Sequence, residues 1–196
     1  MTYSRPTNPA NSEWTYAGMR CVAANAATAP ATPQVTDAMV LASVTKFLPT
    51  TPLGVTPAGG TTLVNIQTIF WLDTPADRTL ATVTLLGHQV RITIHLHGVT
   101  WNFGDGHTAT TTTPGREYTA SDRCSTPQCP GFFGHIYTDT SRSGPATVTA
   151  TATWTAAYSV DNGPTNTITT PITAKPTTTN ITVTQQRGQL IPEPTP

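Results

Sequence analysis

Charged residues are scarce in this chain of 196 residues: they make up 10% of the composition, and Lys+Arg 10 against Asp+Glu 10 gives a formal net charge of zero. No basic patch is available to neutralise a run of phosphates, which argues against nucleic-acid binding. Long apolar runs are also missing, and no window reaches the ~18 apolar residues that a membrane span needs. The sequence therefore predicts neither a nucleic-acid partner nor a membrane span.

Cysteine is rare as well, with three residues in the chain. Cys124 and Cys129 enclose a short segment containing Pro127, which suits a small closed loop, and a disulfide there would stabilise the fold by roughly 2 kcal/mol on the loop-entropy model. A zinc site is the competing interpretation, but the chain lacks a second cysteine pair, so the disulfide is preferred. Cys21 is left over, either free or bridged to a partner.

Threonine is abundant, and the printed sequence contains 44 of them alongside 18 Pro and 14 Gly. Threonine favours strands, whereas frequent proline and glycine discourage long helices, so an all-β fold is expected. Low charge with abundant Thr and Pro is also common outside the cell. We expect an extracellular or cell-surface location. The first residues lack an export signal, so the start is expected to be truncated or misassigned, or export to use another route.

The chain divides into four predicted parts. Residues 1–33 are a flexible segment without apolar periodicity, and residues 34–50 form a short helix that begins at Thr36 or Asp37. The helix is expected to turn one face inward, carrying Met39, Val40, Val44 and Phe47. Residues 51–185 form a β-sandwich, and residues 186–196 form a Pro-rich tail.

Within 51–185 the alternation of apolar and polar residues predicts the strands. The range 62–72 is expected to be one strand with a bulge, and 80–86 is expected to form a hairpin with 89–97 through Gly87-His88. At Gly98 the apolar parity resets, which indicates a bend or bulge. The cleanest strand covers 146–160. Asp161-Asn162-Gly163 then turns the chain into 165–173, and a last strand covers 180–184.

The densest local motif is Trp-Asn-Phe-Gly-Asp-Gly at residues 101–106. Trp101 and Phe103 share a parity and so point to one face of a strand, while Asn102 points away. Gly104 and Gly106 flank Asp105, which suits a turn with positive φ beside a side chain that accepts hydrogen bonds from nearby amides.

This motif resembles the Trp-Asp-Phe-Gly-Asp-Gly signature of PKD domains, named after the polycystic kidney disease protein. Further matches follow in the same order: His135-Ile136-Tyr137 resembles the family's His-x-Tyr, and Gly144 with the strand after it is similar to the closing Gly-x-Tyr-x-Val strand. Asn102 replaces the usual Asp, Ala146 stands near the family's Tyr, and the segment between Gly106 and His135 is longer than usual. The residues at the signature positions are Trp101, Asn102, Phe103, Gly104, Asp105, Gly106, His135 and Tyr137.

The resemblance covers about residues 99–160. It implies an immunoglobulin-like β-sandwich without catalytic residues of its own. Such domains usually belong to extracellular or cell-surface proteins, including bacterial ones, and serve there as spacers, adhesion modules or accessories beside enzymes.

Two metal-binding arrangements compete with simpler interpretations. His95 and His97 lie two apart on a strand, with His88, His107 or His135 as a third ligand, but solvent-facing histidines on a polar strand face explain the same residues. Asp105 could bind calcium with Asn102, but a turn-capping carboxylate explains it better. No metal and no cofactor are therefore expected.

No catalytic grouping is suggested either, because Gly-x-Ser-x-Gly is absent and no Ser-His-Asp set is locally apparent. Among the aromatics, parity sends Trp101, Trp154 and Tyr158 into the core. Trp71 remains as a candidate ligand-binding residue, together with His95 and His97.

The leading hypothesis is a non-catalytic extracellular module that acts by contact with a protein or a cell-wall or glycan surface, in adhesion, spacing or surface assembly. The alternative is a carbohydrate-binding or hydrolase-accessory domain, and a small zinc-dependent enzyme is a third class. An exposed aromatic or polar cleft at Trp71, Trp14 or the His95/His97 face would favour the alternative.

Overall fold

The computed structural model describes residues 3–4, 15–16, 33–48, 50–124, 127–141 and 143–186. The chain divides into two compact units, Met1–Gln34 and Val35–Pro196. In the first unit, β1 (Tyr3–Ser4) pairs antiparallel with β2 (Thr15–Tyr16). Apart from Pro33, the rest of the predicted flexible segment, including Trp14 and Cys21, lies outside the described residues, as does most of the Pro-rich tail.

The second unit is all-β apart from one short helix among its described residues, as the composition predicts. The helix is α1 (Asp37–Phe47). The strands are β3 (Leu53–Thr56), β4 (Thr61–Leu63), β5 (Gln67–Leu72), β6 (Asp77–Thr79), β7 (Val83–Leu85), β8 (His88–Asn102), β9 (Thr108–Thr111), β10 (Gly134–Ile136), β11 (Ala146–Val160), β12 (Thr165–Thr173) and β13 (Thr177–Thr184).

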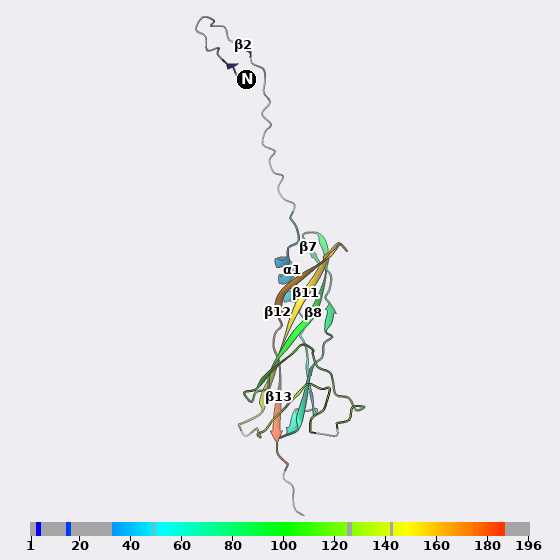
Figure 1. The fold of residues 1–196 in the computed structure, drawn as a ribbon, viewed down its shortest axis with the longest axis vertical. Coiled ribbons are helices and arrows are strands. Elements are labelled where there is room, and N and C mark those ends of the chain that lie inside the picture. The colour runs from blue at the N-terminus through cyan, green and yellow to red at the C-terminus, as the bar shows by residue number, and fades with distance from the viewer. Residues whose placement is uncertain are drawn as a thin grey trace, which may run out of the picture. The chain divides into compact units, whose positions relative to one another are not determined.

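Two long antiparallel strands, β8 and β11, run the length of this unit (Figure 1). Their register shifts between Thr153, which faces Gly98, and Trp154, which faces Leu96, so His97 is the extra residue of a β-bulge. An inserted residue reverses the side-chain alternation. The buried side chains are therefore at even-numbered positions up to Ile94 and at odd-numbered positions from Val99 onward. The predicted parity reset at Gly98 is confirmed.

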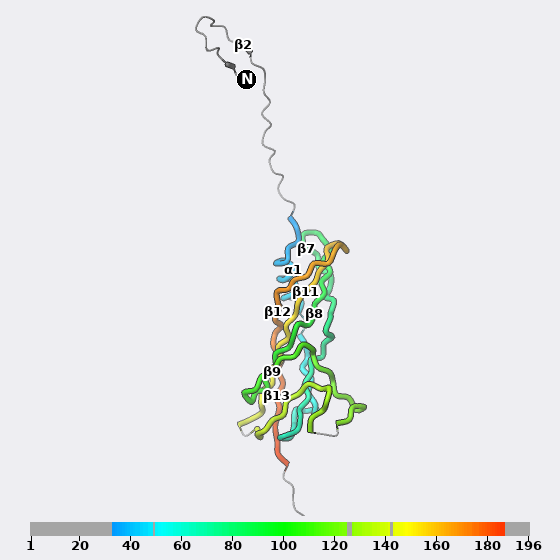
Figure 2. The backbone as a smooth tube through the Cα atoms, viewed as in Figure 1, coloured from blue at the N-terminus to red at the C-terminus, as the bar shows by residue number. Residues whose placement is uncertain are grey.

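Shorter strands flank this pair. β13 and β12 pair with successive halves of β11, and β4 extends the sheet beyond β13 as a parallel neighbour. The other edge of β8 pairs, segment by segment, with three short strands: β7, then β6, then β9. The result is one large sheet, with α1 and β7 toward one end and β9 and β13 toward the other (Figures 1 and 2).

A second sheet of three strands, β10-β5-β3, packs on one face of the large sheet. Phe70 of β5 is fully buried, and its ring centroid lies 6.4 Å from that of Trp101 and 5.7 Å from that of Phe103. These rings belong to different sheets, so they are the hydrophobic contact between the two layers. The described fold is consistent with an all-β sandwich.

The helix α1 packs on the same face of the large sheet, toward its other end. Val40 and Val44 are fully buried and belong to the same core as Tyr158 of β11. Phe47, expected on the inner face, is instead 47% exposed, because it lies in the last turn, where the helix ends.

Two predicted boundaries were wrong. The range 62–72 is two strands rather than one: the chain turns at Asn65 (φ 61°), and β4 and β5 join different sheets. The first hairpin turns at Leu86-Gly87, both with positive φ, so His88 already pairs with Leu85. In contrast, the strand at 146–160 and the turn at Asp161-Asn162 lie where the sequence placed them.

Candidate functional site

The signature motif at residues 101–106 ends β8 inside the core. Trp101 is fully buried, and its indole Nε1 donates a hydrogen bond to Thr111 Oγ1 at 3.1 Å. Phe103 is also buried, while Asn102 between them is exposed. The inward direction of the two aromatic side chains, inferred from parity, is confirmed.

The turn that follows is held by two side-chain caps. Asn102 Oδ1 accepts from the Gly104 amide at 2.9 Å, and Asp105 Oδ1 accepts from the His107 amide at 3.0 Å. Gly104 and Gly106 have φ of 77° and 92°, a region in which side chains are strained. Asn102 therefore keeps the acceptor that matters for this turn although it lacks the charge of an Asp.

The same turn is joined to the second sheet by His135. The His135 Nε2 atom lies 2.6 Å from Asp105 Oδ2, and the His135 ring stacks on Phe103 with centroids 4.1 Å apart. Tyr137 packs edge-on against His135, and its hydroxyl donates to the Phe103 carbonyl at 3.1 Å. The β8–β9 turn and β10, which belong to different sheets, are thus fastened by a polar and aromatic contact.

Two pKa values reflect this packing. Partial burial alone would raise the pKa of Asp105, but hydrogen bonds from His135 and the His107 amide, with the nearby imidazoles, outweigh it and lower the pKa below its ordinary value. Burial first, and then the Asp105 carboxylate, raise the pKa of Tyr137 well above the ordinary value for tyrosine. The Tyr137 hydroxyl therefore acts as a donor and not as an acid.

The remaining histidines are placed differently from the sequence hypothesis. His95 Nδ1 lies 2.7 Å from Asp77 Oδ1 of β6, and His88 Nδ1 lies 2.6 Å from Asp161 Oδ2 in the β11–β12 turn. Neither pairing was foreseen, because each Asp comes from another strand or turn. His97 is exposed in the bulge.

Within the described ranges, the potential metal ligands that gather in a group of three are Asp105, His107 and His135. The sequence hypothesis considered His107 and His135 only as additional ligands for His95 and His97. The available signal was the motif itself: Asp105 and His135 both belong to the PKD-like signature, and His107 follows it directly.

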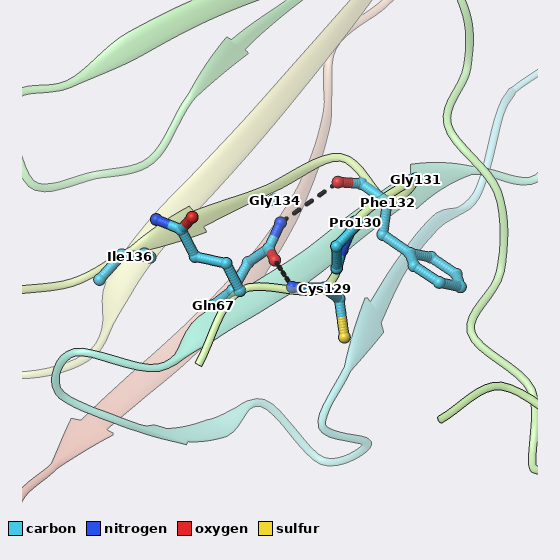
Figure 3. A pocket seen from close by; sticks show the side chains of 8 residues that line it. Gln67, Cys129, Pro130, Gly131, Phe132, Gly134 and Ile136 are labelled. Carbon is cyan, nitrogen blue, oxygen red and sulfur yellow. Dashed lines mark hydrogen bonds between the residues drawn. The ribbon is translucent and has the colours of Figure 1, made fainter. Parts of the chain in front are cut away.

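Cys124 and Cys129 form a disulfide with Cα atoms 5.2 Å apart, as predicted. Beside this loop is a surface hollow of about 420 Å³ (Figure 3). The amide of Gln67 lies in it, donating to the Phe132 carbonyl at 3.2 Å and accepting from the Cys129 amide at 2.6 Å. Gln67 thereby anchors the disulfide loop to β5.

The aromatic residues Trp71, Trp101, Trp154 and Tyr158, expected from the sequence to be core or ligand-binding residues, are mostly buried. Trp154 is fully buried and Tyr158 is 6% exposed, as parity predicted. Trp71 is partly buried, and its indole lies across the facing strand over Gly54, where a Cβ atom would collide with the ring. In the described part of the chain these residues do not assemble into a flat exposed aromatic surface.

The outer face of the large sheet carries a dense array of threonines instead. Residues directly opposite each other on paired strands share a face, so the register identifies the neighbours of the outward β11 threonines. Thr147 Oγ1 donates to Asn180 Oδ1 at 3.1 Å across the β11–β13 pair. We define the threonine face as Thr147, Thr149, Thr151, Thr153 and Thr155 of β11, Thr100 and Asn102 of β8, Thr108 and Thr110 of β9, Thr173 of β12, and Thr178 and Asn180 of β13.

The residues of the threonine face carry no charge, and at one end Thr155 lies opposite His95, which contacts Asp77. The face points away from both covering layers, since α1 and the small sheet pack against the buried face of the large sheet. Sequence reasoning identified the alternation in β11 but assigned no role to its polar side. The neighbouring threonines on the other strands come together only through the register.

Comparison of this chain with protein-family models, with curated proteins and with solved structures finds no match in any of the three. The likeness to PKD domains therefore rests on the signature residues themselves. Over the described residues, no helix is long and apolar enough to cross a membrane.

Proposed function

We propose that this chain is a non-catalytic extracellular β-sandwich module of the PKD-like, immunoglobulin-like type, which acts by contact with a protein or cell surface. The observation that carries the proposal is the threonine face, a broad outer sheet surface of uncharged hydroxyl and amide groups that is bordered at Thr155 by the His95–Asp77 pair. We assign the contact to this face.

The PKD-like assignment is supported by the structural role of each signature side chain. Trp101 and Phe103 fill the core, Asn102 and Asp105 cap the turn, and His135 fastens that turn to the second sheet. Side chains that pack in the core, cap a turn and join two sheets stabilise the fold. The other histidine–aspartate pairs likewise tie strands and turns together.

The physical chemistry of the threonine face suits adhesion. Strands in a sheet lie about 4.8 Å apart, and residues two apart on one strand are separated by roughly 6.7 Å, so the hydroxyls form a regular grid. Threonine is stiff at χ1, which keeps the entropy lost on contact small. Uncharged groups also cost less to desolvate than charged ones, and their interactions are weakly sensitive to salt.

An extracellular location is supported by the Cys124–Cys129 disulfide, since such bonds persist in oxidising compartments. The alternative, carbohydrate binding, would use the hydroxyl and amide groups of the threonine face for hydrogen bonding. The burial of Trp101 and Trp154 weighs against the stacking mode of sugar recognition.

The test places a charge in the centre of the threonine face. The purified chain and its Thr151→Glu variant are passed over immobilised cell-wall fragments and a glycan array, and self-association is measured by sedimentation velocity. Thr45→Glu is the matched control, because Thr45 is an exposed threonine on α1, which covers the opposite face of the sheet.

We expect saturable binding to a wall fraction, or self-association, that is lost in Thr151→Glu and kept in Thr45→Glu. Loss confined to defined glycans would identify the carbohydrate-binding alternative. Binding that survives Thr151→Glu in a folded variant would overturn the assignment of the contact to this face. Turnover of any wall fragment would contradict the non-catalytic proposal.

A further inference from the structure

We propose that Asp105, His107 and His135 form a binding site for Zn²⁺ or a similar borderline divalent transition-metal ion, placed between the β8–β9 turn and β10. The three residues come from two sheets and meet at the outer end of the turn. This inference does not depend on the proposed contact function.

The geometry is convergent. Asp105 Oδ2 lies 2.6 Å from His135 Nε2 and 3.3 Å from His107 Nδ1, and the ligand atoms of all three residues lie within 4.8 Å of one another. Ligand atoms about 2.0–2.2 Å from a tetrahedral zinc ion are separated from each other by roughly 3.3–3.6 Å. The His107–Asp105 distance already has this value. The His135–Asp105 distance is that of a hydrogen bond, which the cation would replace.

The ligand atoms of the three side chains determine which metal ion the site prefers. Two imidazoles and one carboxylate are typical of zinc, with a fourth position for water or a group from a partner. Calcium takes six to eight oxygen ligands, and this group offers one carboxylate, while the neighbouring Asn102 oxygen already accepts from the Gly104 amide. The site should therefore discriminate against Ca²⁺ and Mg²⁺.

Two of the three ligands are held in place before a metal arrives. The side chain of His135 is 15% exposed and stacks on Phe103, and Asp105 Oδ1 is fixed by the His107 amide, which leaves Oδ2 directed toward both rings. Such outer contacts fix ligand orientation in metal sites. The side chain of His107 is 71% exposed and is free to complete the coordination.

The experiment uses the full chain after treatment with chelator. ZnCl₂ is titrated by calorimetry at neutral pH, and CoCl₂ is added separately as a spectroscopic probe, because tetrahedral cobalt absorbs strongly in the visible. The decisive variant is His107→Ala. This side chain is on the surface, so its removal leaves the core intact. His97→Ala is the matched control, since it also removes one exposed histidine, in this case from β8 itself.

We expect one Zn²⁺ per chain, a visible Co²⁺ spectrum that Zn²⁺ displaces and excess Ca²⁺ does not, and a melting temperature that rises with zinc concentration. His107→Ala should weaken zinc binding at least tenfold and abolish the tetrahedral Co²⁺ bands, whereas His97→Ala should leave both unchanged. Absence of saturable binding, equal affinity in His107→Ala, or a loss in His97→Ala would each overturn the site and leave Asp105–His135 as a hydrogen-bonded clamp.

Discussion

The hydroxyl of Tyr158 donates a hydrogen bond to the Asp37 carboxylate at 2.7 Å, across 121 residues of sequence. Tyr158 lies near the end of β11, and Asp37 is in the first turn of α1, so this bond ties the helix to the large sheet beside the Val40 and Val44 contact. The hydrogen bond to Asp37, together with burial, raises the pKa of Tyr158.

Replacing Tyr158 with Phe should loosen α1. The exposed Asp37 is solvated once the hydroxyl is gone, so the expected loss is that of a hydrogen bond to a charged group, about 1.5–3 kcal/mol. Hydrogen exchange should speed up in the α1 amides and remain slow in β8. Tyr118→Phe, which removes a hydroxyl bonded to the Asp122 carbonyl in a loop, is the control and should leave α1 unchanged. Unaltered α1 exchange in Tyr158→Phe would show that the tether is dispensable.

The two glycines of the signature turn should respond differently to alanine. Both have positive φ, which costs a non-glycine residue about 1–2 kcal/mol. A Cβ on Gly104 would also come within 2.6 Å of the Thr147 carbonyl oxygen, whereas one on Gly106 would have nothing within 4 Å. In urea unfolding, Gly106→Ala should lower the free energy of unfolding by about 1–2 kcal/mol, the cost of positive φ. Gly104→Ala should lower it by clearly more, because the close contact adds to that cost. Equal losses would mean that the β11 backbone yields at no cost.

The two fully buried tryptophans form a second matched pair. Trp101 Nε1 donates to Thr111, whereas Trp154 Nε1 is buried without a hydrogen-bond partner among the described residues. Both Trp→Phe changes create a cavity, but the change at Trp154 also removes an unsatisfied donor. Trp101→Phe should therefore be the more destabilising, by about 1–3 kcal/mol. Chemical denaturation of both variants measures the difference, and the reverse order would contradict the assigned bonding.

Acid should destabilise the fold through its paired carboxylates. The pKa of Asp105 is lowered, that of Asp161 is lowered chiefly by the His88 hydrogen bond, and the bonds from Arg116 lower that of Asp122 to about 2. A depressed folded-state pKa contributes stability that is present above the unfolded value, about 3.9, and is lost as the pH falls through the folded value.

Melting temperature should accordingly decline from about pH 4 downward. Asp105→Asn should have a lower melting temperature at pH 6 and a shallower decline on acidification, because it has no charge to lose. Asp73→Asn, at an exposed carboxylate, serves as the control and should follow the wild-type curve. Parallel curves for wild type and Asp105→Asn would rule out a stabilising role for this carboxylate.

Much of the fold could be predicted because it depends on short-range patterns. The alternation in 146–160 fixed the whole of β11, and the buried aromatics followed from the parity of Trp101 and Phe103. The Cys124–Cys129 pair was predictable because its loop is short. The boundary errors at Asn65 and Leu86 occurred where a residue other than glycine adopts positive φ, which propensity does not reveal.

The candidate site was harder to predict from the sequence than the fold. The pairing of Asp105 with His135 joins residues 30 apart in sequence from different sheets, and the His95–Asp77 pair depends on β6 lying beside β8. The threonine face likewise depends on which strands are neighbours and in what register.

The signature turn has some features that follow from the sequence and others that only the tertiary structure decides. From the sequence alone it follows that Trp101 and Phe103 point inward, that Gly104 and Gly106 turn the chain, and that Asp105 caps the turn, because each depends on residues within a few positions. Only the tertiary structure sets His135 against that carboxylate with His107 beside it. Bringing β10 to the β8–β9 turn is a long-range event, governed by the packing of Phe70, Phe103 and their neighbours between the two sheets.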